Sequence, residues 1–258
     1  MPLSYQLIYF ITAFLNLTIA LGIYLRRPRE QLVKAFAIFI TSITAWIITL
    51  YFFYSISTQV EVIVVGRINF VFAELIAYFS FLFVYLFPEK TWRMPAWLSA
   101  ALGIGTTLLC AVTFATDLVD QVEVIKGVSR ITDYGPLYFL FVVEFISFSV
   151  ASIALLIGKY RRFKGAARRQ ILLFALGWGG TLLMGITTNI VLPGLTGNYD
   201  VQNLGPISTL FLVVATAYAV ARHELLNIKV LATEVFLVAL LLLFVINSAL
   251  STSLSNQI

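Results

Sequence analysis

The sequence predicts an all-α fold, a polytopic helical bundle that crosses a membrane seven times and carries an eighth hydrophobic segment. Of its 258 residues, 60% are hydrophobic and 11% are charged, whereas a soluble domain is nearer half apolar and a quarter charged. The charges gather in short clusters between apolar runs. These runs match the roughly 20 residues that a helix needs to cross a bilayer. The composition therefore excludes an ordinary water-soluble fold.

Each predicted span is one of the long apolar runs. The eighth run, Val235–Leu250, has no charge but is marginal in length, so it either spans a thinned bilayer or lies partly in the interface. The seven predicted spans are Leu3–Leu25, Val33–Ser55, Val62–Phe87, Met94–Thr116, Pro136–Gly158, Gln170–Leu192 and Leu204–Ala221.

The orientation follows from the distribution of lysine and arginine between alternate loops. Fourteen of the 17 cations lie in one set of loops, and the other set contains Lys126 and Arg130 alone. Because cytoplasmic loops carry the excess of cations, the amino terminus is predicted outside and the end of the seventh span inside. We expect a multi-pass protein of the cell (plasma) membrane, with the lipid bilayer as its first partner.

One external loop, from Asp117 to Tyr134, is longer than the others. Its alternating β-branched residues on either side of Lys126 and Gly127 predict a small hairpin. The hairpin either caps the outer mouth of the bundle or serves as a simple connector.

Three ionisable residues lie well inside predicted spans: Arg67, Glu74 and Glu144. Each costs about 2.5 to 3.5 kcal/mol at the membrane centre, so all three are expected to face protein or water. Arg67 and Glu74 are seven residues apart, which places them on one helix face. Arg67 and Glu144 have similar predicted depths, which permits a cross-helix ion pair. The two interpretations are a polar ligand-sensing pocket in the outer half and an ion pair that holds two spans in register.

The sixth span contains closely spaced small residues, Gly177, Gly179, Gly180 and Gly185. Such a stripe permits close approach of a neighbouring helix. At the outer end of this span, Asn189 and the following proline are expected to unwind the last turn and expose backbone groups to a pocket.

Several classes of function are excluded by what the sequence lacks. It has one cysteine, Cys110, and one histidine, His223, so neither an intramolecular disulfide nor a metal site is predicted. No catalytic residues and no cofactor are predicted, since phosphate-binding, zinc-protease and serine-hydrolase motifs are missing. The basic loop Lys159–Arg169 is read as a topology signal that also suits anionic head groups, and no nucleic-acid partner is expected.

The chain carries an ordered set of motifs: Phe79-Ser-Phe-Leu-Phe83, Leu86-Phe-Pro88, Tyr134-Gly-Pro-Leu-Tyr138, the basic loop Lys159–Gln170, Asn189-Ile-Val-Leu-Pro193, Leu204–Leu210 and Ala217–Lys229. In this order and spacing they resemble a known family, the seven-transmembrane amino-terminal sensor region of bacterial membrane-bound histidine kinases. The resemblance covers roughly residues 1 to 230.

The resemblance implies that the bundle receives a signal and passes it through the last span to a cytoplasmic output domain that dimerises. It places Arg67 and Asn189 at family positions and makes Arg222, His223 and Lys229 the transmission junction. His223-Glu-Leu is read as interfacial and not as a phosphoacceptor, because the residues that follow it differ from that motif. Residues 231–258 are read as an additional hydrophobic segment, with the output domain absent.

The predicted function is therefore the signal-sensing region of a two-component histidine kinase without its catalytic domain, either a fragment or a stand-alone sensor. Its predicted partners are a second copy, through the output domain, or a separate cytoplasmic signalling protein. The ligand is not identified by the sequence. The alternatives are a permease for a small solute and a structural scaffold held by the glycine stripe.

Overall fold

The computed structural model describes residues 3–26, 28–56, 58–88, 94–116, 120–124, 130–197 and 199–223. The eighth hydrophobic segment, Val235–Leu250, and the junction residue Lys229 lie outside this range. The described long helices are α1 Leu3–Arg26, α2 Gln31–Ser55, α3 Gln59–Leu86, α4 Ala96–Ala115, α5 Tyr138–Arg162, α6 Gly165–Ile186 and α8 Gly205–His223.

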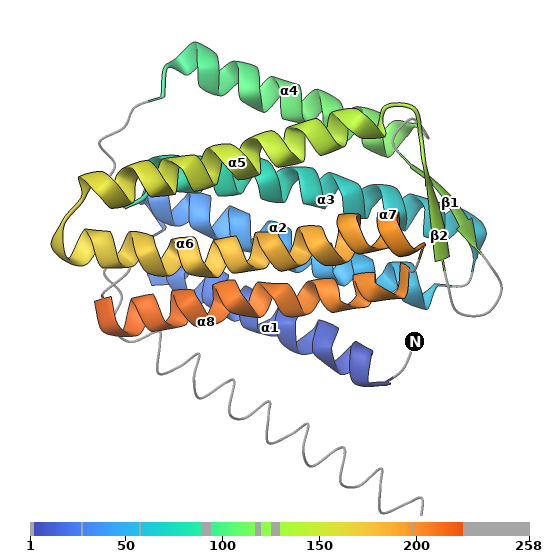
Figure 1. Cartoon of the computed structure of the whole chain (residues 1–258), viewed down its shortest axis with the longest axis horizontal. Helices are drawn as coiled ribbons and strands as arrows, with labels where there is room; N and C mark the ends of the chain where they lie inside the picture. The colour runs from blue at the N-terminus through green and yellow to red at the C-terminus, as the bar shows by residue number, and fades with distance from the viewer. Residues whose placement is uncertain are drawn as a thin grey trace, which may run out of the picture.

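The predicted polytopic helical fold is confirmed. In the described part of the chain, six helices are long and apolar enough to cross a membrane. The seventh predicted span corresponds to α8, which is 19 residues long. The helices lie side by side with their axes roughly aligned (Figure 1).

The sixth span is longer than predicted at both ends. It begins at Gly165, whose positive φ of 62° allows the chain to turn out of the preceding loop. After α6 ends at Ile186, helical structure continues as a π-helix, Thr187–Val191, and then as α7, Leu192–Thr196, which extends past the predicted end at Leu192. Gly197, with a φ of 66°, ends α7 in the left-handed conformation typical of helix termini. A 3₁₀-helix, Tyr199–Leu204, leads into α8.

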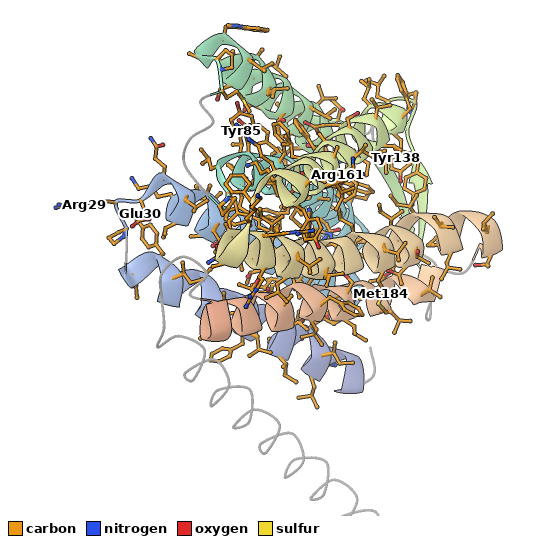
Figure 2. All side chains as sticks on the ribbon, turned by 60° about the vertical axis from the view of Figure 1, so that its left-hand side comes forward. Arg29, Glu30, Tyr85, Tyr138, Arg161 and Met184 are labelled. Carbon is orange, nitrogen blue, oxygen red and sulfur yellow. The ribbon has the colours of Figure 1, made fainter. Side chains whose placement is uncertain are left out.

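The predicted hairpin is also confirmed. Strand β1, Asp120–Val124, pairs antiparallel with β2, Arg130–Tyr134, in a register that sets Asp120 opposite Tyr134. It lies at the end of the bundle where α7 lies (Figure 1). Residues Arg29 and Glu30, between α1 and α2, project from the opposite end (Figure 2). The hairpin therefore marks the predicted outer end, and the connection between α1 and α2 the predicted inner end.

The helices differ sharply in how much of their surface is covered by protein. Helix α2 lies at the centre of the main apolar core, with buried side chains that include Phe36, Phe39 and Ile47. Helix α4 lies at the edge of the bundle (Figure 1), and its buried residues are Thr106 and Thr113. Its other described residues are partly or fully exposed.

Candidate ligand-sensing site

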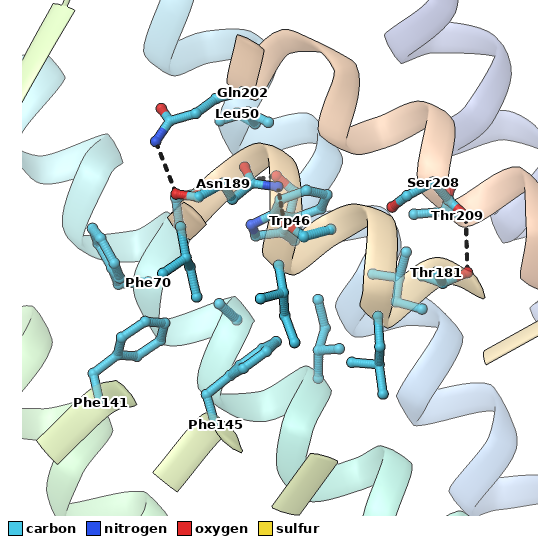
Figure 3. Close-up of a pocket in the computed structure, with 18 of the residues that line it drawn as sticks. Trp46, Leu50, Phe70, Phe141, Phe145, Thr181, Asn189, Gln202, Ser208 and Thr209 are labelled. Atoms are coloured by element: carbon cyan, nitrogen blue, oxygen red, sulfur yellow. Dashed lines mark hydrogen bonds between the residues drawn. The ribbon is translucent and has the colours of Figure 1, made fainter. Parts of the chain in front are cut away.

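A cavity of about 140 Å³ lies between five helices: α2, α3, α5, α6 and α8 (Figure 3). Its wall is largely aromatic, with Trp46 from α2, Phe70 from α3, Phe141 and Phe145 from α5, and Trp178 from α6. None of the described lining residues carries a carboxylate, ammonium or guanidinium group. The cavity is therefore a mainly apolar chamber within the bundle.

The predicted outer end of the cavity carries a network of side-chain amides. Asn69 donates hydrogen bonds to the carbonyl of Trp46 at 2.9 Å and to Thr49 Oγ1 at 2.8 Å, which joins α3 to α2. Gln202 accepts a hydrogen bond from the Tyr54 hydroxyl at 3.1 Å. Amides are satisfied by such partners without any charge, so this network costs little in a membrane.

Asn189 lines the cavity, as the sequence predicted for a ligand-sensing candidate. Its side chain donates to the carbonyl of Gly185 at 2.9 Å. In an α-helix the backbone carbonyl of Asn189 would accept a hydrogen bond from the amide of residue 193, but Pro193 has no amide hydrogen to donate. Gln202 Nε2 donates to this carbonyl at 3.3 Å (Figure 3). The turn thus widens into a π-helix and does not unwind, and the Asn189 carbonyl is hydrogen-bonded within the protein.

Deeper in the cavity, hydroxyl groups join α6 to α8. Thr181 Oγ1 donates to the carbonyl of Gly177 at 3.0 Å and to that of Ser208 at 2.8 Å (Figure 3). Thr209 Oγ1 accepts from Asn16 of α1 at 3.3 Å, and Thr209 also lines the cavity. The cavity wall therefore includes the contacts that hold α8 in place.

The hairpin reaches this cavity through its last residue. Tyr134 lines it and stacks on Tyr138 of α5, with ring centroids 3.8 Å apart. Phe70 of α3 meets the Tyr134 ring edge-on at 6.4 Å. The hairpin is therefore anchored at the cavity wall, which favours the cap over the simple connector.

The three intramembrane charges do not surround this cavity. Arg67, Glu74 and Glu144 are not among its lining residues. Seven-residue spacing placed Arg67 and Glu74 on one face of α3, but it did not say which helix that face meets. The cavity therefore lies on a different face of α3 from the one that carries Arg67 and Glu74.

The two glutamates instead face α4. Glu74 is fully buried, and its Oε1 accepts a hydrogen bond from Thr113 Oγ1 at 2.7 Å. Glu144 accepts one from Thr106 Oγ1, also at 2.7 Å. Both glutamates keep a second buried oxygen without a hydrogen-bond partner among the described residues.

The ion pair considered between Arg67 and Glu144 is not formed. The single hydrogen bond of Glu144 goes to Thr106, and its Oε2 atom contacts no donor in the described part of the chain. Helix α4 instead presents a threonine hydroxyl to Glu144. A role of Arg67, Glu74 and Glu144 in sensing stays a prediction.

The glycine stripe of α6 packs closely against α8. A Cβ atom at Gly177 would lie 2.5 Å from Ala215 Cβ and 3.0 Å from the carbonyl oxygen of Phe211. At Gly180 it would lie 3.3 Å from the Phe211 ring. Helix α6, which lines the cavity, therefore packs directly against α8, the last described helix.

One charged residue in an unexpected place is Lys159. The sequence assigned it to the inner basic loop, but it is 2% exposed. Its ammonium donates to the carbonyls of Val84 at 2.7 Å and Tyr85 at 2.8 Å, and to that of Phe87. Lysine near a helix carboxyl end satisfies the free carbonyls there. The sequence indicated that the carbonyl end of α3 needs a donor, because α3 ends just before Pro88 and no glycine caps it.

The predicted transmission junction is described in part. Arg222 and His223 are the last two residues of α8, and their side chains, like the whole of Lys229, lie outside the described part of the structure. These three residues stay a prediction.

The fold and cavity define a multi-pass membrane helical bundle with an internal chamber. The family model described as "N-terminal 7TM region of histidine kinase" matches residues 8–229. The chain belongs to this family, which confirms the resemblance seen in the sequence. No curated protein and no solved structure gives a significant match.

Proposed function

We propose that the chain is the signal-receiving region of a two-component histidine kinase in the plasma membrane. In this proposal, occupation of the cavity shifts the packing of α8, and α8 carries the change to a dimeric cytoplasmic output domain. Family membership supports the sensor role. In the described part of the chain, nothing favours the permease alternative.

The observation that carries the proposal is that α8 forms part of the cavity wall. Ser208 and Thr209 of α8 line it, opposite residues of α2, α3 and α5. A ligand that contacts these walls differently in two packings of the bundle shifts the equilibrium between them. Such coupling between two sites is typically 1 to 3 kcal/mol, or roughly 5- to 150-fold in an equilibrium constant.

The test is a fusion of this chain, in frame after α8, to the dimerisation and ATP-binding region of a histidine kinase. Ala73 lines the cavity, so Ala73→Phe fills it. We expect autophosphorylation in membrane vesicles to change about fivefold or more.

Ala111→Phe is the matched control, because Ala111 lies on the exposed surface of α4. It should leave autophosphorylation unchanged. Equal autophosphorylation by the Ala73→Phe and Ala111→Phe fusions would contradict the proposal, provided that both insert at wild-type levels.

A further inference from the structure

The size of the cavity restricts what can occupy it. Its volume of about 140 Å³ is close to that of the roughly 150 Å³ cavity that accepts benzene in another protein. Along α6 the lining runs from Trp178 to Ile190, which is about 18 Å at 1.5 Å per residue. A space of this volume accommodates one ring with a short substituent.

The wall chemistry restricts the charge of the occupant. A charged ligand in an apolar site needs an opposite charge or several hydrogen bonds to offset desolvation. The described lining offers neither a cation nor an anion. The amide groups of Asn69 and Asn189 and the hydroxyl of Thr181 already donate within the protein. A neutral occupant is the one that this wall can hold without a large cost.

One lining residue has a buried polar atom that no protein group satisfies. Trp178 is 1% exposed, and its indole Nε1 has no hydrogen-bond partner. An indole N–H is a donor only, and a buried donor left unsatisfied costs about 1 to 3 kcal/mol. Among the described lining residues, no other buried side-chain atom stands unsatisfied. Only an acceptor would satisfy this donor.

We infer that the cavity binds a small neutral molecule with an apolar body of single-ring size and a hydrogen-bond acceptor that meets Trp178 Nε1. This inference rests on the proposed function only for its consequence in signalling. The binding itself is a property of the chamber, its uncharged wall and one unsatisfied indole.

The experiment measures binding of four matched probes to the full chain in lipid nanodiscs by ligand-observed NMR, with empty nanodiscs subtracted. Acetophenone has one ring and a carbonyl acceptor. Ethylbenzene lacks the acceptor, benzoate is charged, and benzophenone has a second ring. We expect saturable binding of acetophenone, weaker binding of ethylbenzene, and no saturable binding of benzoate or benzophenone.

Two variants locate the site. Ala73→Phe should abolish saturable acetophenone binding, while Ala111→Phe should leave it intact. Trp178→Phe keeps a ring and removes the donor, so the affinity ratio of acetophenone to ethylbenzene should fall about two- to tenfold. A comparison of this ratio cancels any general loss of packing, because both probes fill the same space.

Specific results would overturn the inference. An unchanged ratio in Trp178→Phe would show that the indole is met by water and not by the ligand. Saturable binding of benzoate would contradict an occupant that must be neutral. Acetophenone binding that survives Ala73→Phe would place the binding site outside this cavity. If the probes bind as expected while the Ala73→Phe fusion signals normally, the ligand class stands and the proposed function fails. If the Ala73→Phe fusion alters signalling while acetophenone does not bind, the proposed function stands and the ligand class fails.

Discussion

Helices α2 and α4 are held in the bundle by opposite means. Of the 25 residues of α2, 13 are buried, and all but two of these are apolar. The 20 residues of α4 include two that are buried, both threonines, and each donates a hydrogen bond to a glutamate of a neighbouring helix. Lipid is as apolar as leucine, so apolar burial alone does not favour helix association; close packing and polar contacts do.

This contrast separates a rigid part of the bundle from a lightly attached one. The cavity lies among the closely packed helices, where α6 and α8 meet at glycine. The glutamates lie where α4 joins α3 and α5. We therefore expect packing substitutions to affect the whole bundle and polar substitutions at α4 to release one helix.

The largest effect is expected at the contact between α6 and α8. Gly177→Ala would place a Cβ atom 2.5 Å from Ala215 Cβ, and overpacking of this kind costs about 1 to 3 kcal/mol. We expect a lower free energy of unfolding, measured by denaturant titration in mixed micelles. Gly179→Ala is the matched control, because its nearest neighbour would be 3.9 Å away.

A second substitution tests whether the contact itself is responsible. Removal of the opposing methyl group in the double variant Gly177→Ala, Ala215→Gly should restore part of the lost stability. If Gly177→Ala is as stable as Gly179→Ala, then α6 and α8 are not closely packed at this position.

The next largest loss of stability is expected at Lys159, whose ammonium makes polar contacts within the closely packed part of the bundle. Lys159→Met removes three hydrogen bonds to the end of α3 and leaves buried carbonyls behind. Bonds from a charged donor are worth about 1.5 to 3 kcal/mol, offset in part by the cost of burying the ammonium. We expect a loss of about 1 to 2 kcal/mol in the same titration.

Lys164→Met is the control for this change, since Lys164 is exposed and both variants remove one cation from the same predicted inner loop. Equal stability of the two variants would show that Lys159 serves topology alone.

Lys159 also shows where sequence reasoning succeeds and where it stops. Hydropathy located the helices and the charge clusters because each depends on residues that are adjacent in the chain. Whether a lysine at a helix end points to water or to a neighbouring helix depends on the packing of α5 against α3. No local pattern contains that information. The same limit applies to Glu144, whose helix face was predictable but whose neighbour, α4, was not.

The cavity is a second case of this limit. Asn189 could be selected from the sequence because asparagine four residues before a proline predicts an unpaired carbonyl. Trp46, Trp178 and Gln202 could not, because aromatic residues are ordinary in any span and Gln202 lies in a connecting segment. Their convergence follows from five helices meeting, which is a tertiary property.

On the lightly attached side, we expect the larger effect at Thr113. Thr113→Val removes the hydroxyl that donates to Oε1 of the fully buried Glu74, at a cost of about 1 to 1.7 kcal/mol, the upper part of the range measured for such bonds in membranes. Cys110 is the single cysteine of the chain and lies one turn away on α4. Release of α4 should therefore speed labelling of Cys110 by a membrane-permeant maleimide about fivefold or more.

Thr107→Val is the matched control for labelling. Its hydroxyl donates to Gly103 within α4 at 2.8 Å, on an exposed surface, so its loss should leave the rate unchanged. A Thr113→Val variant that labels like Thr107→Val would mean that α4 is held by something other than the glutamate contacts.

The smallest effect is expected at Thr106. Its hydroxyl bonds Glu144 at the same 2.7 Å, but Glu144 is only partly buried, so lipid head groups or water can replace the lost donor more readily than at Glu74. Thr106→Val should cost about 0.6 kcal/mol, the average for such bonds, and raise Cys110 labelling about threefold or less. If the two contacts hold α4 independently, the free energies add in the double variant with Thr113→Val. A double variant no faster than Thr113→Val alone would place the whole attachment of α4 at Glu74.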